Sequence, residues 1–413
     1  MFELKHILRD GSRRAGEIVE TFGISRVTLK NAYEREAGKI LRLGRARRTR
    51  YAARQILAGL QTDEFPVFRV DEHGAIQAAG TLITLVASES VWLPDETILA
   101  GLPREMHDAA PRGFLGRSFA HRNAELGLPG DVTQWSDNHA LIALSRRGED
   151  MPGNLVIGRE SFNRFQELRH PRSTKEDFPA LSAAASAGEH RGSSAGGERP
   201  KFTALVEGQH RIVKYATKES DNARRWQDLL MLEHIALETL REARITTAET
   251  HLVDIGNLRC LVVTRFDRVG VSGRRAAVTL AAASIDMNDS WADAAEKLRK
   301  RGEITDEDFR NIALLDAFGT LIANTDRHHF NLMLFPMDGA YSLAPAFDQL
   351  PMAYAPPASG ILPNSAVAEP RPAVNTLAVW DEARELARAF WKRAEDQPLT
   401  DRMRAIVKVH ASR

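Results

Sequence analysis

The stretch LIANTDRHHFNLML, residues 321–334, begins apolar, becomes densely polar and then turns apolar again. Within it, Asp326 and Asn331 lie five positions apart. A carboxylate can accept the proton of an attacking hydroxyl group, and an amide oxygen can bind a metal ion. The pair therefore predicts a catalytic loop. For this stretch taken alone, a helix-capping turn is the alternative.

The same Asp-to-Asn spacing occurs in the catalytic loop of protein kinases, where the Asp is the base and the Asn holds magnesium. A second metal-binding carboxylate is then needed downstream, and Asp348 in LAPAFDQLP supplies it. Hard oxygen ligands of this kind suit Mg²⁺. The spacing favours phosphoryl transfer, with Asp326 as the catalytic base and Asn331 and Asp348 as the metal ligands.

The adjacent residues His328 and His329 raise the question of a zinc site. Neighbouring histidines of a strand point to opposite faces and rarely bind one ion. The sequence contains no H-E-x-x-H or other zinc spacing. We therefore expect no zinc here, and we expect His328 to brace the catalytic loop.

A stretch rich in small residues, 179–200, precedes two predicted strands, KFTALV and RIVKYA. Its composition alone is typical of a flexible linker. Its last part, SSAGGERP, runs directly into the first strand, and a Gly/Ser loop in that position exposes backbone N–H groups that can bind phosphate. Gly196 and Gly197 are the expected phosphate contacts.

Lys214 lies in the second predicted strand between Val213 and Tyr215. A lysine with apolar neighbours is expected to be half-buried and to need an anionic partner. Kinases pair such a lysine with ATP phosphates and a helix carboxylate. The helix predicted over residues 226–241 offers Glu233 or Glu238 for this role. An exposed strand lysine is the alternative.

Positive charge is concentrated at the N-terminus. The first 54 residues contain 14 Lys or Arg and 6 Asp or Glu, a net charge of +8, although the whole chain carries only +1. Such an excess attracts polyanions. Helices are predicted over residues 2–8, 13–22 and 26–37, with a turn at Gly23, an N-cap at Ser25 and a basic hairpin afterwards. This order is typical of a winged helix-turn-helix that binds DNA, and a solvated basic module is the alternative.

The predicted DNA contacts lie at the start and on the open side of the third helix and at or near the tip of the hairpin. They are Ser25, Arg26, Thr28, Lys30 and Asn31 on the helix, and Arg45, Arg47, Arg48 and Arg50 on the hairpin.

The remaining composition restricts the class of protein. A single cysteine, Cys260, excludes an intramolecular disulfide and a multi-cysteine zinc site. No secretory signal is visible, and the most apolar stretch, around residues 78–93, is too short and too polar to span a bilayer. We therefore expect a soluble cytoplasmic protein with no membrane partner.

Together these motifs resemble the HipA family of bacterial serine/threonine kinases. The segments that carry the resemblance are SSAGGERPKF, RIVKYA, VVTRFDR, NTDRHHFNLML and APAFDQLP, and they follow the family's order. The basic N-terminus is similar to the YjjJ-type branch, which has a fused winged helix. The resemblance implies a toxin that phosphorylates a protein serine with Mg·ATP. An aminoacyl-tRNA synthetase is one candidate substrate, and a small DNA-binding antitoxin is the usual partner.

Carried over by position, the resemblance implies that Lys201 and Lys214 contact the ATP phosphates and that Glu233 is the carboxylate partner of Lys214. The backbone at Val263, Arg265 and Phe266 would line the adenine site.

The family also autophosphorylates a phosphate-loop serine, which expels the loop and silences the kinase. Ser193 best matches this serine, and Ser194 is its neighbour. A phosphate there would clash with ATP phosphates. Arg199 stands where the family commonly has a glutamine, which puts the closure of the loop in doubt.

We expect an α+β chain with a HipA-like bilobal kinase fold. The expected parts are a winged helix-turn-helix at residues 1–60, an N-terminal lobe with a mixed β-sheet at 61–265 and a mostly α-helical C-terminal lobe at 266–413. A homodimer would place two winged helices on a palindromic operator. Two other functions stay open. One is a DNA-binding regulator whose kinase-like body only senses nucleotide, and the other is nucleotidyl transfer or small-molecule phosphorylation.

Overall fold

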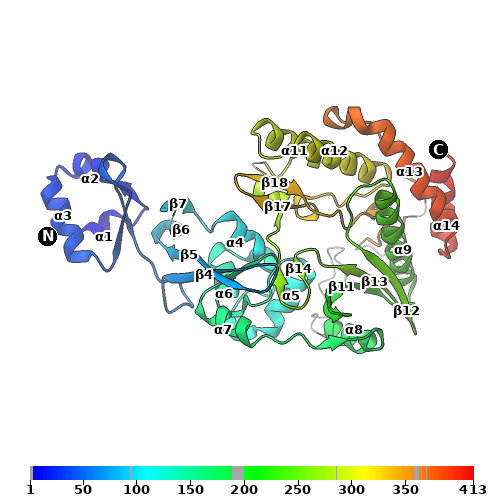
Figure 1. Cartoon of the computed structure of the whole chain (residues 1–413), viewed down its shortest axis with the longest axis horizontal. Coiled ribbons are helices and arrows are strands. Elements are labelled where there is room, and N and C mark those ends of the chain that lie inside the picture. The colour runs from blue at the N-terminus through cyan, green and yellow to red at the C-terminus, as the bar shows by residue number, and fades with distance from the viewer. Residues whose placement is uncertain are drawn as a thin grey trace. The chain divides into compact units, whose positions relative to one another are not determined.

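The computed structural model describes residues 3–93, 95–187, 200–284, 286–357, 362–363, 365–368 and 370–413. They form two compact units. The first comprises Met1–Val70, Ala75–Pro111 and Asn123–Leu168, and the second comprises Asp71–Gly74, Arg112–Arg122 and Arg169–Arg413. Both units contain helices and strands (Figure 1), which confirms the mixed α+β class. The expected three-part division at residues 60 and 265 stays a prediction.

Three helices and a three-stranded sheet form the N-terminal part of the first unit. Their bounds are α1 Leu4–Ile7, β1 Arg13–Arg14, α2 Ala15–Phe22, α3 Arg26–Glu36, β2 Ile40–Leu43, the 3₁₀ turn η1 Ala46–Arg48 and β3 Arg50–Ala53, and the sheet order is β1-β3-β2. Gly23 ends α2 with a φ of 59°, and the Ser25 hydroxyl caps α3 by accepting a bond from the Thr28 N–H. Both were predicted. Arg13 and Arg14 belong to β1 rather than to the predicted helix, because they pair with β3.

A second sheet, of order β7-β6-β5-β4-β8, follows in the first unit. Its strands are β4 Glu64–Val70, β5 Ile76–Thr84, β6 Glu89–Leu93, β7 Thr97–Ala100 and β8 Leu155–Ile157. The accompanying elements are η2 Val86–Ser88, α4 Arg104–Ala109, η3 Ala124–Leu126, η4 Val132–Gln134, α6 Asp137–Arg147 and α7 Arg159–Glu167. In the sequence, alternating apolar and polar residues predict strands near residues 65–70 and 77–85, and helices are predicted near 139–146 and 160–167; β4, β5, α6 and α7 confirm these four elements.

The second unit contains the sheet that carries Lys214, of order β12-β13-β11-β10-β9. Its strands are β9 Arg172–Ser173, β10 Lys201–Val206, β11 Gln209–Ala216, β12 Thr250–Ile255 and β13 Leu258–Thr264. β9 runs parallel to β10 and the other neighbours are antiparallel, so the sheet is mixed, as expected. Helix α9, Asp221–Glu242, packs against β11, β12 and β13.

The C-terminal part of the second unit is mostly helical, as expected. Its helices are α10 Leu280–Ala283, α11 Trp291–Lys300, α12 Asp306–Leu321, α13 Trp380–Glu395 and α14 Asp401–Ala411. Short strands and 3₁₀ turns connect them: β14 Arg268–Val269, β15 Gly273–Arg274, β16 Val278–Thr279, η6 His329–Asn331, β17 Met333–Met337, β18 Ala340–Leu343, η7 Met352–Tyr354 and η8 Val374–Val379. Helix α12 packs against both α11 and α13 (Figure 1), and Trp291, Phe318 and Phe390 are buried in their shared core.

The linker indicated by composition over residues 179–200 is wrong for its first part. Residues Phe178–Ala187 form helix α8, preceded by the 3₁₀ turn η5 Lys175–Asp177. Alanine is the strongest helix former, and Phe178 anchors the helix because it is fully buried, with its ring centroid 5.6 Å from that of Phe202 in β10. Residues 188–199 lie outside the described residues.

No helix within the described ranges is both long and apolar enough to cross a bilayer.

Cys260 is expected to react with thiol reagents only when the protein opens. It lies in β13, is fully buried, and burial raises the pKa of its thiol to about 12. At pH 8 the thiolate fraction is then lower by a factor of about 10³ than for an ordinary cysteine. The rate of reaction with Ellman's reagent, measured against urea concentration, should follow unfolding. As a control, S412C adds an exposed thiol that reacts at once, and rapid reaction of the wild-type protein without urea would contradict the prediction.

Candidate active site

Lys214 lies between two carboxylates that are distant in the sequence. Its Nζ donates to Glu233 Oε1 at 2.6 Å and to Asp348 Oδ1 at 2.5 Å. Lys214 comes from the central strand β11, Glu233 from α9 and Asp348 from the turn after β18. Lys214 is 7 % exposed and Glu233 is 1 % exposed. The predicted need for an anionic partner is confirmed. The structure selects Glu233 over Glu238, whose carboxylate binds Arg241 instead.

The charges of this cluster hold each other in the ionised state. Burial by itself would lower the pKa of the Lys214 ammonium, but the charges of Asp348 and Glu233 outweigh burial and raise that pKa. Burial would likewise raise the pKa of the Asp348 carboxyl, but the charge of Lys214, assisted by Lys201, lowers it. At neutral pH the site therefore contains a charged lysine and a charged Asp348.

The predicted catalytic loop begins where α12 ends in a Schellman turn. The Ala323 N–H donates to Thr320 O at 3.1 Å and the Asn324 N–H to Gly319 O at 2.8 Å. Ala323 takes the left-handed position of this turn with a φ of 62°, where glycine is usual. Asp348 also has a positive φ, of 57°. Left-handed residues other than glycine are strained and concentrate at functional sites.

Asn324 connects Asp326 to Asp348. Asn324 is 1 % exposed, its Oδ1 accepts from the Asp326 N–H at 3.0 Å, and its Nδ2 donates to Asp348 O at 3.4 Å. This one side chain therefore fixes the main chain at both of the acidic residues predicted to act in catalysis.

Arg327 ties the loop back to α12. Its Nε donates to Asp316 at 2.9 Å, and its guanidinium also binds the Asn324 carbonyl. Gly319 makes room for this crossing, because a Cβ there would lie 2.6 Å from the Cδ of Arg327. Asp316 is 4 % exposed and accepts from the Ala292 N–H at the start of α11. The loop is thus attached to two helices.

The two histidines have different surroundings. His329 is 2 % exposed and its Nε2 lies 2.8 Å from Asp289 O. His328 is exposed, and its Nε2 lies 3.6 Å from Asp326 Oδ1. The Trp291 indole N–H donates to His328 O at 3.1 Å. The buried ring of His329 therefore anchors this segment, which forms the 3₁₀ turn η6 rather than a strand. That the His328 side chain braces the loop stays a prediction.

The donor set fits a magnesium ion. Asn331 Nδ2 donates to the Asp326 carbonyl at 2.8 Å, which leaves the amide oxygen of Asn331 as its cation-binding atom. Asp348 provides a carboxylate. Mg²⁺ is usually held by one or two carboxylates together with substrate phosphates. The part of the chain that the structure describes contains no group of three or more His, Cys, Asp or Glu residues able to hold a metal ion alone.

Lys201 lies beside Lys214. The two are paired across β10 and β11, so their side chains share a face of the sheet. Both positive charges lower the pKa of Asp348. Gly196, Gly197, Ser193 and Ser194 precede β10 in the sequence, and all four lie outside the described residues.

The predicted adenine-lining residues fall at and after the end of β13. Val263 is 8 % exposed, and the Arg265 side chain forms a buried bidentate pair with Asp267, at 2.9 and 2.8 Å. The Phe266 ring lies 5.9 Å from the rings of both Phe335 and Phe347. The Arg265 guanidinium is therefore engaged, and only the backbone of this segment fits the predicted role.

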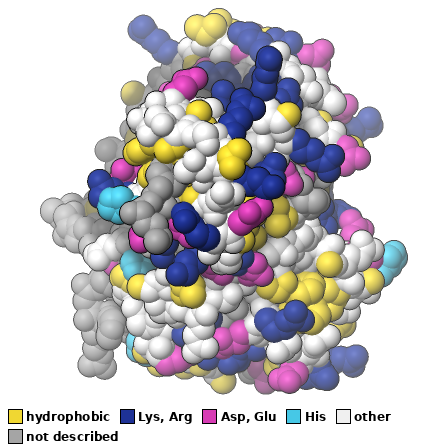
Figure 2. All heavy atoms as spheres, turned by 90° about the vertical axis from the view of Figure 1, so that its left-hand side faces the viewer, with side chains coloured by type: hydrophobic (Ala, Val, Ile, Leu, Met, Phe, Trp, Pro, Cys, Tyr) yellow, Lys and Arg dark blue, Asp and Glu magenta, His cyan; other side chains and the backbone are white. Residues whose placement is uncertain are grey.

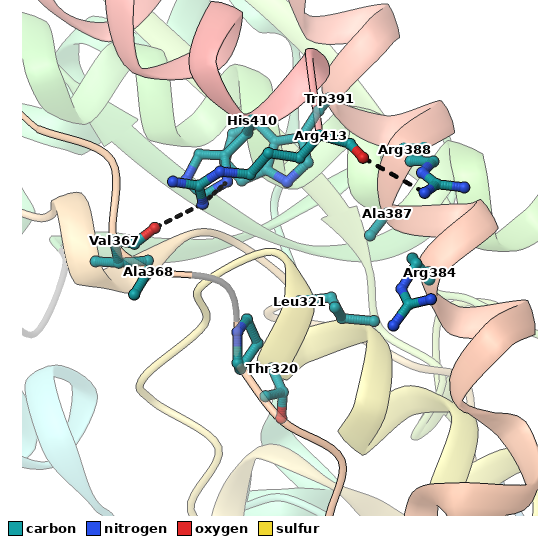
Figure 3. A pocket seen from close by; sticks show the side chains of 11 residues that line it. Thr320, Leu321, Val367, Ala368, Arg384, Ala387, Arg388, Trp391, His410 and Arg413 are labelled. Atoms are coloured by element: carbon teal, nitrogen blue, oxygen red, sulfur yellow. Dashed lines mark hydrogen bonds between the residues drawn. The ribbon is translucent and has the colours of Figure 1, made fainter.

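A small cavity lies elsewhere in the second unit, among α12, α13 and α14 (Figure 3). Its volume is about 40 Å³, well below the roughly 300 Å³ at which ligand pockets begin. In Figure 3 the Arg413 guanidinium reaches the Val367 carbonyl, at 2.7 Å, and the His410 ring is stacked on Trp391. This cavity is too small for a nucleotide.

The residues predicted to contact DNA are mostly exposed. They are Ser25, Arg26, Thr28, Lys30 and Asn31 on α3 and Arg45, Arg47 and Arg48 around η1. Arg50 differs. It begins β3, and its guanidinium donates to the carbonyl and hydroxyl of Ser12 at 3.1 and 3.0 Å. Arg50 therefore supports the domain instead of extending from the hairpin tip.

Sequence reasoning missed Asn324, Arg327 and Asp316. Asn324 and Arg327 flank Asp326 in NTDR, and a run of polar side chains beside a predicted catalytic base is a usable signal. Asp316 carries no such signal, because only the folded α12 brings it to Arg327.

Comparisons with known proteins identify the family of this chain. The family described as "YjjJ-like toxin, middle domain" matches residues 61–166, and the one described as "HipA-like C-terminal domain" matches residues 193–412. Toxin YjjJ of Escherichia coli (strain K12) is 32 % identical over 428 residues, covering 99 % of this chain and 96 % of that protein.

A solved structure shares the fold. The HipA, HipB and operator DNA complex of Shewanella oneidensis MR-1 contains a chain that matches with a TM-score of 0.52 and 14 % identity. The match covers 84 % of this chain and 95 % of that chain. With that fold and a relative matched over nearly the whole length, this chain belongs to the HipA-like family, in its YjjJ-like toxin branch.

Proposed function

We propose that this protein is an Mg·ATP-dependent serine/threonine protein kinase of the toxin type. The observation that carries the proposal is the cluster in which Lys214 joins Glu233 to Asp348. Asn324 connects this cluster to Asp326. A lysine paired with a helix carboxylate and a loop with this Asp–Asn spacing are recurring parts of protein-kinase sites.

Each residue has one role in this proposal. Lys214, positioned by Glu233, binds the phosphates of ATP together with Lys201 and the loop that contains Gly196 and Gly197. Asn331 and Asp348 hold Mg²⁺, which neutralises charge on the transferred phosphate when it is bound. The backbone around Val263 and Phe266 receives the adenine.

The reaction then follows from the position of Asp326. The oxygen of the acceptor hydroxyl forms a bond to the γ-phosphorus, and the bond from that phosphorus to the β–γ bridging oxygen breaks. ADP leaves with the electron pair, and the Asp326 carboxylate takes the proton of the hydroxyl. Asn324 and Arg327 keep the loop in place during this step.

The first test locates phosphate on the purified protein. After incubation with Mg·ATP, intact and peptide mass spectrometry should find phosphate on Ser193 or Ser194. Phosphorylation of either serine would silence the kinase by repelling ATP phosphates. Protein that starts unmodified, binds ATP and gains no phosphate would overturn the proposal and favour the nucleotide-sensing regulator. Transfer of AMP, or phosphorylation of small molecules alone, would favour the third function.

We further propose that the N-terminal domain is a winged helix that binds DNA. Its α3 presents polar and basic residues, and η1 presents three exposed arginines. Lys and Arg side chains in Figure 2 are interspersed with Asp and Glu. The local excess of positive charge lies in the first 54 residues, whose net charge is +8 although that of the whole chain is +1. The related HipA was solved with HipB and operator DNA. An antitoxin or an operator is accordingly a candidate partner, and the acceptor protein would carry the target serine.

Removing the three hairpin arginines should reduce the salt dependence of DNA binding. In the triple variant Arg45→Ala, Arg47→Ala and Arg48→Ala, the slope of log K against log salt should fall by about 3, because each lost phosphate contact releases about one counterion fewer. Fluorescence anisotropy with a labelled DNA fragment of this protein's own promoter measures the slope. The control is a second triple variant, Arg402→Ala, Arg404→Ala and Lys408→Ala, which removes three positive charges from α14. Equal slopes in both triple variants would contradict the prediction.

A further inference from the structure

A short helix from the middle of the chain belongs to the catalytic unit. Helix α5, Gly113–Arg122, lies within residues 61–166, which match the middle-domain family. Its residues nevertheless belong to the second compact unit, and α5 contacts β10, the strand that begins with Lys201. The segment before α5 therefore lies where it can affect the active site.

Arg112, immediately before α5, contacts the catalytic loop. The centre of its guanidinium lies 4.4 Å from the ring centroid of Phe330. Phe330 sits between Asp326 and Asn331, inside η6. A cation placed over an aromatic face within about 6 Å is attracted by the ring. The contact therefore involves a residue that lies between the predicted base and the predicted metal ligand.

The backbone of Arg112 is itself fixed. Its carbonyl accepts from the Gly116 N–H at 2.8 Å, so Arg112 occupies the start of α5. Phe114 and Phe119 of the same helix are 2 % and 7 % exposed. A buried helix thus holds the arginine against the loop.

Phe330 also contacts His328, which lies two residues after the predicted base. The Phe330 and His328 rings lie 5.9 Å apart in an edge-to-face arrangement, and His328 Nε2 lies 3.6 Å from Asp326 Oδ1. Arg112, Phe330, His328 and Asp326 therefore form a continuous series of contacts.

We propose that Arg112 is a positioning residue, which holds η6 through Phe330 so that Asp326 faces the acceptor hydroxyl. The middle-domain segment thereby completes the catalytic loop. This inference rests on the proposed kinase function. Displacements of about 1 Å in a catalytic group can cost about 100-fold in rate, so a contact of this kind affects turnover more than nucleotide binding.

Kinetics of variants test the role. We expect Arg112→Met to lower the single-turnover rate of autophosphorylation about tenfold, with the Kd for Mg·ATP unchanged. Arg112→Lys, which keeps the cation, should retain part of the rate. Phe330→Leu should have an effect similar to Arg112→Met, and the double variant should be no slower than either. Additive losses, or a weaker Kd without a change in rate, would overturn the proposal.

A matched control lies on the same helix. Arg122 is exposed, and its Nε donates to Ser118 O of its own helix. Arg122→Met therefore removes one charge from α5 away from Phe330, and it should leave the rate unchanged.

Hydrogen exchange separates this inference from the kinase proposal. Arg112→Met should speed amide exchange in a peptide covering residues 324–333, relative to Arg122→Met, whether or not phosphate is transferred. Absence of phosphate transfer by the wild-type protein would overturn the proposed function. Faster amide exchange in Arg112→Met than in Arg122→Met would still show that Arg112 orders the loop. Equal exchange in the two variants would overturn the positioning role.

Discussion

Asp326→Asn is expected to lower the rate of phosphate transfer about 10²- to 10⁴-fold, because a general base contributes that much to catalysis. The amide of asparagine cannot accept the proton of the acceptor hydroxyl. The substitution keeps the size of the side chain, and the Asp326 side chain is 44 % exposed. Autophosphorylation with radiolabelled ATP measures the rate, and binding of a fluorescent ATP analogue shows whether the nucleotide site is intact.

The free energy of unfolding should change little in this variant. The two shorter hydrogen bonds that fix residue 326 run through its main chain, from its N–H to Asn324 and from Asn331 to its carbonyl, while its side chain accepts a longer bond from Asn331, at 3.4 Å. Exposed substitutions of this kind usually change stability by less than about 0.5 kcal/mol. Asp338→Asn, in the exposed turn between β17 and β18, is the matched control. An Asp326→Asn protein that transfers phosphate at the wild-type rate would remove Asp326 from the mechanism.

Features that depend on local sequence could be predicted. Ser25 caps α3 because its hydroxyl reaches an N–H three residues later, a contact that requires no other part of the fold. The apolar spacing of residues 380–392 predicts a helix with one buried face. It is α13, with Ala383, Ala387 and Phe390 buried on its core side. Asp326 and Asn331 were found for the same reason, since their spacing lies within one short loop.

Features that depend on tertiary packing could not be predicted. The choice between Glu233 and Glu238 depends on how α9 is rotated against β11. The bond from Arg50 to Ser12 depends on a turn 38 residues away. The linker expected over residues 179–200 was a matter of composition, and α8 forms because Phe178 finds a buried site beside Phe202.

The catalytic loop shows both cases. The motif NTDR indicated that Asp326 is functional, but not that Ala323 adopts a left-handed conformation. Only this backbone turn directs Asn324 toward Asp348, which lies 24 residues further along the chain. Sequence spacing therefore identified the reactive groups, and the structure identified the residues that hold them in place.

Lys214→Met is expected to lower the free energy of unfolding by about 3–5 kcal/mol at pH 7, because it leaves Glu233 and Asp348 without their buried cation. The loss should depend on pH. In the wild type the pKa of Asp348 is lowered from 3.8. Its contribution is therefore present above that value and is lost as the pH falls. In the variant, the two carboxylates repel each other and their pKa values rise, so stability is lost as the pH rises. The two proteins should converge near pH 4, measured by urea unfolding.

Two further variants decide whether charge is the cause. The double variant Lys214→Met, Glu233→Gln removes one of the two carboxylate charges left without a cation. It should recover more than half of the lost free energy of unfolding at pH 7. Lys218→Met removes an exposed lysine just beyond β11 and should change stability by less than about 0.5 kcal/mol. If Lys214→Met and the double variant are equally unstable at every pH, the loss comes from packing around the lysine stem. If the double variant recovers stability without regaining phosphate transfer, Lys214 both stabilises the fold and binds the phosphates. Neutralising Glu233 removes the repulsion between the carboxylates but cannot supply a cation for the phosphates.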